Sequence, residues 1–381
     1  MLSFPCILMR GGSSKGLFFV ESDLPSDPEL RDKICVRAFG GPDPHGKQIN
    51  GVGGTIANMN KLAIISRREG EPNTVNYAFG QVDIYSWDIG RKATCGNISS
   101  AVGPFAVERH LVDVIEEPIT KVRIYDVNTG KYILSHVPVK DGQVVYEGDF
   151  RIAGVPGSGA KIQLDFLEPG GPTTGKLLPT GHVKDILETK DFGPVEVSIV
   201  DAANPFVFFK LEDVGFDGTE LAKAINASGD KIEKMRQIRD AACVRLGWAA
   251  TPEEAREKSP LVPKIIGVAP PRDFTSNIGE SFRKEEFDFS ARMLEYGMSA
   301  DIMALTGCVG LAVAAKIPGS AVNEVMSPES REKNDLVLAY SGGLIPAGVE
   351  IGEKDGELFA VRGTVYRTAR KMMEGMVSVI L

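Results

Sequence analysis

Cys95 stands where a helix is expected to begin. The stretch Thr94-Cys95-Gly96-Asn97 is followed by two serines and an apolar run, within GRKATCGNISSAVGPFAVERH. The first turn of a helix presents free backbone N–H groups and the positive end of the helix dipole, which favour a thiolate and can hold a carboxylate. A cysteine is more often a small buried hydrophobic residue. The Gly-Asn turn and the serines nevertheless favour a functional thiol.

Lys61 is the second candidate for proton transfer. It follows GVGGTIANMN and precedes the apolar run LAIIS, at the mouth of a predicted strand. A lysine that is partly removed from water there favours the neutral amine, which is the form that acts as a base. Gly51, Gly53 and Gly54 would let the backbone approach a ligand closely. The alternative for Lys61 alone is a solvated lysine at a strand end.

Two glycine-rich stretches resemble nucleotide-binding loops only superficially. MRGGSSKG (9–16) lacks the G-x-x-x-x-G-K-[ST] spacing, and GVPGSG (154–159) lacks the G-x-G-x-x-G order, so neither predicts a nucleotide site. Ser13 and Ser14 follow a predicted strand and could donate to a carboxylate. Taken alone, they favour an ordinary polar turn.

Composition excludes several classes of function. The net charge is −8 with no block of Lys or Arg, which argues against nucleic-acid binding but not against an anionic substrate. No apolar run reaches the roughly 20 residues of a membrane span, and no signal peptide is expected. The histidines lack the spacing of a metal site. Of the cysteines, Cys6, Cys35 and Cys243 are predicted to be structural, and their scatter fits a reducing cytosol. We therefore expect a cytoplasmic protein without a metal, and a homodimer on base rates.

The elements that position these residues predict two similar halves. The 381 residues exceed what one compact domain needs. In the first half, strand-like runs with hairpin turns at 128–131 and 140–143 surround a helix over 97–110 that contains Pro104. The second half has a strand pair over 195–211, a helix over 230–247, a helix opened by Thr251, and a small-residue helix over 306–319.

Each half thus contains a small-residue helix that a short polar motif introduces. The first motif is Thr94–Asn97, and the second is Thr306-Gly307-Cys308. This weak repeat predicts an N-terminal domain over 1–185, which carries Lys61 and Cys95, and a C-terminal domain over 186–381. The active site is expected in a cleft between them, where two helix N-termini face each other.

Seven short motifs follow one another along nearly the whole chain. In order, they are MRGGSSKG, G-x-GG…K-LAII, CGNISSAVGPFA, NTGK, GKLLPTG, DAANP and RTAR. Their ordered set resembles the family of 2-methylaconitate cis–trans isomerase, 3-methylitaconate Δ-isomerase and 4-oxalomesaconate tautomerase. That family is similar in fold to diaminopimelate epimerase. The resemblance implies an α+β protein of two pseudo-symmetric domains, each a curled, mostly antiparallel sheet around a central helix.

The resemblance also implies residue roles and the absence of a cofactor. Lys61 would be the principal base and Cys95 its partner in the active site, while Ser14, Ser99, Gly96 and Asn97 would hold substrate carboxylates. Together with the patterns above, the predicted substrate-binding set is Ser13, Ser14, Gly53, Gly54, Gly96, Asn97, Ser99, Thr306 and Gly307.

Two departures from the family patterns bear on the reaction. In the epimerases a second cysteine heads the second helix, whereas here Thr306 stands at that head and Cys308 is displaced by two residues. Without a second cysteine at that position, a symmetric mechanism with two thiols is not available. This favours an allylic proton shift over racemisation. Some relatives carry a histidine where this chain has Ala300, so the choice of substrate is open.

The expected function is a cofactor-independent isomerase of a small unsaturated di- or tricarboxylic acid, such as methylitaconate, methylaconitate, aconitate or oxalomesaconate. The reaction is a 1,3-shift of an allylic proton, or a cis–trans change through the same carbanion. Either Lys61 or Cys95 can be the first base. The alternatives are an accessory partner of an aconitase-like dehydratase, and a racemase or epimerase of the same fold.

Overall fold

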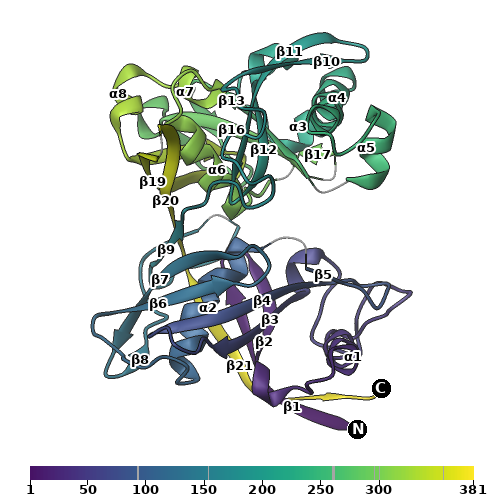
Figure 1. Ribbon diagram of the computed structural model, residues 1–381, viewed down its shortest axis with the longest axis vertical. Coiled ribbons are helices and arrows are strands. Elements are labelled where there is room, and N and C mark those ends of the chain that lie inside the picture. Colours follow the sequence, from purple (N-terminus) through teal and green to yellow (C-terminus); the bar gives the residue numbers. More distant parts are fainter. Residues whose placement is uncertain (92–93, 153, 260–261, 296, 300, 355) are drawn as a thin grey trace. The chain divides into compact units, whose positions relative to one another are not determined.

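The computed structural model describes residues 1–91, 94–152, 154–259, 262–295, 297–299, 301–354 and 356–381. Contacts divide the chain into two compact units (Figure 1). Unit 1 consists of Met1–Asp165 and Tyr366–Leu381, and unit 2 of Phe166–Val365. Two strands, Ile162–Leu167 and Glu357–Arg367, cross these boundaries and are given below with the unit that holds most of their residues.

Unit 1 is a curved sheet with one central helix. Its elements are β1 (Leu2–Gly11), β2 (Ser14–Val20), α1 (Pro28–Phe39), β3 (Lys61–Arg67), β4 (Thr74–Val82), β5 (Ile89–Gly90), α2 (Gly96–Glu108), β6 (Ile119–Asp126), β7 (Lys131–Lys140), β8 (Gln143–Val144), β9 (Ile162–Leu167), β21 (Ala369–Val379) and the short 3-10 helices Glu21–Asp23 and Ala57–Met59. Eleven of the 13 residues of α2 are buried, Pro104 among them. A helix that is buried on every side forms the centre of a domain. Figure 1 shows α2 lying against these strands, and the rings of Phe105 on α2 and Phe18 on β2 lie 5.6 Å apart between centroids.

Unit 2 has the same architecture. Its elements are β10 (Asp185–Thr189), β11 (Gly193–Ala202), β12 (Asn204–Lys210), α3 (Ala222–Asn226), α4 (Asp230–Arg245), α5 (Pro252–Lys258), β13 (Lys264–Ala269), β14 (Phe274–Thr275), β15 (Ser281–Phe282), β16 (Phe289–Glu295), β17 (Met298–Ser299), α6 (Leu305–Ala315), α7 (Ala321–Glu324), α8 (Pro328–Glu332), β18 (Asp335–Tyr340), β19 (Gly343–Lys354), β20 (Glu357–Arg367) and the 3-10 helices Leu211–Val214 and Lys284–Glu286. Every residue of α6 is buried, so α6 is the central helix here.

The pairing of the strands reveals an internal repeat. β1, β2, β3, β4, β6 and β7 pair in turn antiparallel, parallel, antiparallel, parallel and antiparallel. β11, β12, β13, β16, β18 and β19 follow the same alternation. α2 lies between β4 and β6 in the chain, as α6 does between β16 and β18. The predicted fold class, two pseudo-symmetric α+β halves with mostly antiparallel sheets around central helices, is confirmed.

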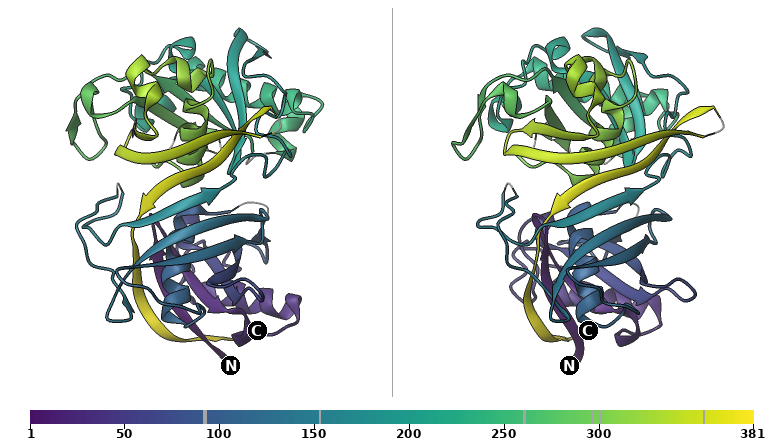
Figure 2. Two further views of the ribbon diagram at one scale, coloured as in Figure 1. Left: turned by 60° about the vertical axis from the view of Figure 1, so that its left-hand side comes forward. Right: turned by 90° about the vertical axis from the view of Figure 1, so that its left-hand side faces the viewer.

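The division of the chain differs from the boundary predicted between residues 185 and 186. Residues 366–381 return to unit 1, because β21 pairs antiparallel with β1 from Leu2↔Val379 to Gly11↔Ala369. Figure 2 shows these two strands side by side at the two ends of the chain. In unit 2 the corresponding neighbour of β11 is β10, which directly precedes it in the chain. Such a long-range pairing leaves no local signal in the sequence.

The helices and hairpins predicted from the sequence occur in the structure. Gly247 follows α4 in a left-handed conformation, and the Thr251 side chain caps α5. The hairpins at 128–131 and 140–143 join β6 to β7 and β7 to β8. β8 ends at Val144, and beyond it Phe150 exchanges two hydrogen bonds with Gly159 of the following loop. None of the helices that the structure describes is long and apolar enough to cross a membrane.

Candidate active site

The head of α2 presents the one cysteine that is not buried. Cys95 is the N-cap residue of α2 and is partly exposed, whereas the other four cysteines are buried. Burial raises the thiol pKa of Cys35 to about 12 and of Cys243 to about 11. The first turn contains no acidic residue. Its N–H groups and dipole are therefore free of an internal counter-charge and suit an anionic ligand.

The β1–β2 hairpin fixes the position of this helix head. Gly12 has φ +53°, and a Cβ there would lie 2.2 Å from Oδ1 of Asn97. The same oxygen accepts a 3.4 Å hydrogen bond from the Ser13 N–H and a 3.2 Å bond from Nε of Arg367. The turn that carries Ser13 and the buried Ser14 thus packs directly on the first turn of α2. Asn97 uses its carboxamide oxygen to hold that contact together.

Within the head, two serines brace the backbone. The Ser99 hydroxyl donates to the Cys95 carbonyl at 3.0 Å, and the Ser100 hydroxyl donates to the Asn97 carbonyl at 2.6 Å. Gly96 is the first helical residue. Ser99 is fully buried, so in this structure its hydroxyl holds the turn that carries Cys95. Its predicted contact with a substrate stays a prediction.

Lys61 is the first residue of β3 and is partly buried. It lies beside Gly16 of β2, where an added Cβ would come within 2.1 Å of the Lys61 carbonyl oxygen, so the strands meet closely at this point. Its ammonium donates to Oε1 of Gln81 on β4. α2 packs against both β2 and β3, so Lys61 and Cys95 come from neighbouring elements of one unit.

The glycines upstream of Lys61 have protein partners. The Gly53 N–H donates to the Phe39 carbonyl at 3.1 Å, and the Gly54 N–H donates to Oε1 of Gln48 at 2.8 Å. The fully buried Asn60 donates to the Gly54 carbonyl at 2.7 Å. These bonds hold the loop in front of β3 in shape. In this conformation neither glycine has a free N–H for a carboxylate, and their predicted role in substrate binding stays a prediction.

A buried polar layer behind the helix head was not predicted. Tyr77 and Asp126 are adjacent in the parallel β4–β6 pair and are almost fully buried. Burial raises the pKa of Tyr77 well above its ordinary value, and the charges of Cys95 and Asp126 raise it further. Burial also raises the pKa of the Asp126 carboxyl, against the opposing effect of the Thr94 hydroxyl. The layer therefore places one titratable carboxyl and one phenol behind Cys95.

The head of α6 is built differently. The helix begins at Leu305, one residue before the predicted start, and its N-cap is Ala304. The buried Thr306 hydroxyl accepts a 3.0 Å bond from Nδ2 of Asn204, and Gly307 follows it in the first turn. Cys308 is fully buried. Ala300, where some relatives carry a histidine, lies outside the described residues.

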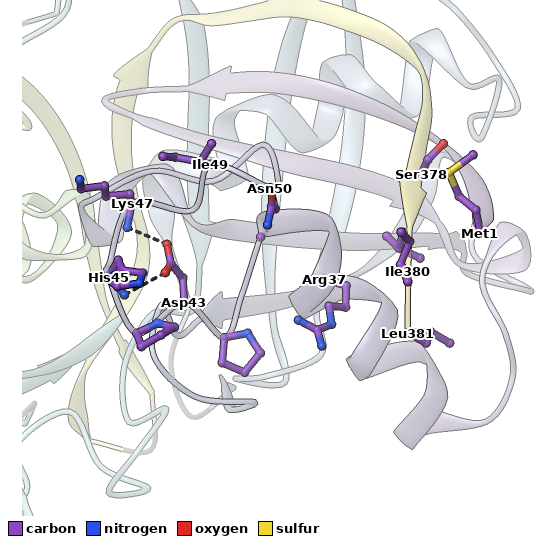
Figure 3. A pocket seen from close by; sticks show the side chains of 14 residues that line it. Met1, Arg37, Asp43, His45, Lys47, Ile49, Asn50, Ser378, Ile380 and Leu381 are labelled. Carbon is purple, nitrogen blue, oxygen red and sulfur yellow. Dashed lines mark hydrogen bonds between the residues drawn. The ribbon is translucent and has the colours of Figure 1, made fainter.

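A cavity of about 1030 Å³ lies elsewhere in unit 1 (Figure 3). Arg37, His45 and Lys47 line it together with residues from both ends of the chain. Asp43 on its wall accepts the backbone N–H groups of His45, Lys47 and Gln48, which lower the pKa of its carboxyl. No residue of the predicted site lines this cavity, so we do not place the chemistry there.

Comparison with known proteins gives the family. A model of the PrpF protein family matches residues 1–380. The chain is 39% identical over 379 residues to 3-methylitaconate isomerase of Eubacterium barkeri, covering 99% of this chain and 97% of that protein. It is 35% identical over 381 residues to 2-methyl-aconitate isomerase of Shewanella oneidensis, covering 97% and 95%. A crystal structure of methylitaconate-delta-isomerase, 39% identical, superimposes with a TM-score of 0.88 over 99% of this chain and 96% of that one. The predicted family resemblance is confirmed.

Proposed function

Because this chain belongs to the PrpF protein family, we propose that it moves a double bond in a small unsaturated di- or tricarboxylic acid, by proton transfer at the head of α2 and without a cofactor. The chain is an isomerase, as are the relatives named above. One observation carries the choice of site: Cys95, the cysteine that is not buried, caps α2 in the same unit as Lys61.

The proposed reaction begins at a carbon next to the C=C bond. The neutral amine of Lys61 takes a proton from that carbon, and the electron pair of the broken C–H bond spreads through the double bond onto a carboxylate or keto oxygen. Backbone N–H groups in the first turn of α2 donate to this oxygen. The Cys95 thiol then protonates the far carbon, so the double bond moves by one position. Transfer of a proton from the Lys61 ammonium to the Cys95 thiolate restores both groups.

The same intermediate permits two variants of this scheme. With the order reversed, the Cys95 thiolate is the base and the Lys61 ammonium is the acid. Rotation before reprotonation at the original carbon gives a cis–trans change instead of a shifted double bond. Both variants need an anionic intermediate at the positive end of α2, where the first turn has no acidic side chain. We take Lys61 as the principal base because its nitrogen is held by the neutral amide oxygen of Gln81 and forms no ion pair with a carboxylate among the described residues.

The substrate class follows from the same features. The acids named for the relatives, 3-methylitaconate and 2-methylaconitate, are the first candidates, with aconitate and oxalomesaconate next. The experiment is proton NMR of the purified protein in heavy water with each acid, without an added cofactor. Loss of an allylic proton signal and growth of a shifted vinyl or methyl signal would support the proposal. A folded protein that exchanges no proton in any of the acids would contradict it.

Several finer points are part of the proposal. Thr306 and Gly307 lie in unit 2, and their contact with the substrate is a prediction. A homodimer and a cytoplasmic location are also predictions, and light scattering after gel filtration tests the first of them.

The racemase alternative needs a reactive thiol at both helix heads, whereas Cys308 of α6 is fully buried. The comparisons do not favour an accessory partner of a dehydratase.

A further inference from the structure

Lys61 has an unusual set of partners for a partly buried cation. Its ammonium donates to Oε1 of Gln81 and lies 5.6 Å from the ring centroid of Phe79. Among the residues that the structure describes, no Asp or Glu forms an ion pair with this ammonium. A neutral amide oxygen is thus the group that holds the nitrogen.

The Gln81 carboxamide is itself fixed in one orientation. Gln81 stands directly opposite Lys61 in the antiparallel β3–β4 pair. Its Nε2 donates to the carbonyl of Ala57 at 3.1 Å and to the carbonyl of Asn60 at 3.2 Å. Both N–H groups of the amide are therefore used, and only the oxygen can face Lys61. The buried Asn60 in turn ties this loop together through the carbonyls of Gly54 and Ile56.

The chemistry explains why an amide suits this place. A carboxylate next to Lys61 would fix the nitrogen as well, but its negative charge would stabilise the ammonium relative to the free amine. An amide oxygen directs the nitrogen through one hydrogen bond and carries no net charge. We infer that Gln81 is a positioning residue for the isomerisation: it aims Nζ of Lys61 while leaving it able to act as a base. This inference rests on the proposed role of Lys61.

A purely structural role for Gln81 makes a different prediction. In that case Nε2 matters because it ties β4 to the loop before β3, and Oε1 does not matter. Gln81→Glu keeps the shape and the oxygen that faces Lys61, but it adds a charge beside Lys61 and removes the two bonds that Nε2 donates to Ala57 and Asn60. Gln81→Met keeps the length and removes both functions. Asn76→Asp is the matched control, because it adds the same charge to the same strand about five residues away, roughly 16 Å at a strand rise of about 3.3 Å per residue, where the charge is largely screened.

The experiment is the pH dependence of kcat/KM for these variants and for Lys61→Met, with folding checked by circular dichroism. For Gln81→Glu we expect the ascending limb of the profile to move up by about 1–2 pH units, with activity recovering toward the wild-type plateau at high pH. For Gln81→Met we expect kcat to fall about tenfold or more, as when a positioned group is lost, while KM changes little. Asn76→Asp should follow the wild-type profile.

The outcomes separate the inference from its premise. An unshifted limb in folded Gln81→Glu would overturn the inference. If that variant does not fold, kcat of Gln81→Met within twofold of the wild type would overturn it instead. Full turnover by Lys61→Met would refute the role of Lys61 itself, whatever Gln81 does. An inactive Lys61→Met together with unmoved Gln81 profiles would leave the proposed function standing and remove only the role of Gln81.

Discussion

The heads of α2 and α6 occupy equivalent places in the two units but expose different groups. At α2 the N-cap residue is Cys95, partly exposed. At α6 the N-cap is Ala304, and the thiol of that helix, Cys308, is fully buried. The remaining polar side chain there, Thr306, already accepts a hydrogen bond from Asn204. The fold thus supplies a central helix twice and an accessible thiol once.

This difference shows that the repeat explains the architecture but not the chemistry. Both central helices are buried because each sheet needs an apolar helix to cover its inner face. A thiol takes part in proton transfer only where the substrate can reach it and where its anion is stabilised. At the α2 head Cys95 is partly exposed, the first turn contains no acidic residue, and Lys61 lies on a neighbouring strand. One thiol and one amine suit a proton shift between two different carbons.

The largest effect is expected from removing the base. Lys61→Met keeps the aliphatic stem beside Phe79 and removes the amine. Since a positioned base contributes about 10²–10⁴-fold, we expect kcat/KM to fall at least a hundredfold with KM little changed. Steady-state kinetics on the acid identified by NMR measure this. A variant with wild-type turnover would exclude Lys61 from the reaction.

The next effect separates the two helix heads directly. Cys95→Ala should lower kcat by about 10²-fold or more through loss of the second proton-transfer group. Cys308→Ala should leave kcat within about twofold and instead cost on the order of 1 kcal/mol of stability, because it removes a buried sulfur from the core. Kinetics and thermal unfolding of both variants give the comparison. Equal loss of activity in Cys95→Ala and Cys308→Ala would mean that both helix heads take part in the reaction.

A smaller effect is expected at the hairpin that fixes the α2 head. In Gly12→Ala the new Cβ would meet Oδ1 of Asn97 at 2.2 Å and so displace the helix head. We expect kcat to fall about tenfold, because a shift of about 1 Å in a site is costly. Gly70→Ala is the matched control, since Gly70 also has a positive φ but no atom within 4 Å of the added Cβ. Similar losses in both variants would assign the effect to backbone strain alone.

The smallest effect concerns the buried carboxyl behind Cys95. Because the folded-state pKa of Asp126 is raised by burial, the folded protein binds that proton more tightly than the unfolded chain. The penalty of burying the charge is absent at low pH and appears as the pH rises through the folded-state pKa. In urea titrations, Asp126→Asn should therefore raise the free energy of unfolding by an amount on the order of 1 kcal/mol at pH 8, and raise it less at pH 4. A destabilisation that is equal at both values would contradict this.

The sequence predicts the parts of the site that lie close together in the chain. The helix that Cys95 opens, the strand that Lys61 opens and the hairpin of Ser13 follow from local patterns. Gln81 does not, because its place opposite Lys61 depends on the register of two strands 20 residues apart.

Arg367 and Asp126 were missed for a related reason. Arg367 reaches Asn97 only because the end of the chain returns to pair with β1. Asp126 reads as the residue before a hairpin turn, and only the parallel pairing of β4 with β6 places it beside Tyr77. Contacts set by long-range register leave no periodicity in the sequence.

The most direct test of a single reactive head is alkylation of the native protein with iodoacetamide, followed by peptide mass spectrometry and activity on the same samples. We expect one modification per chain, on Cys95, with activity lost in proportion and with both slowed by saturating substrate. Full activity in a protein whose Cys95 is completely alkylated, or loss of activity that follows another cysteine, would show that the chemistry does not take place at the head of α2.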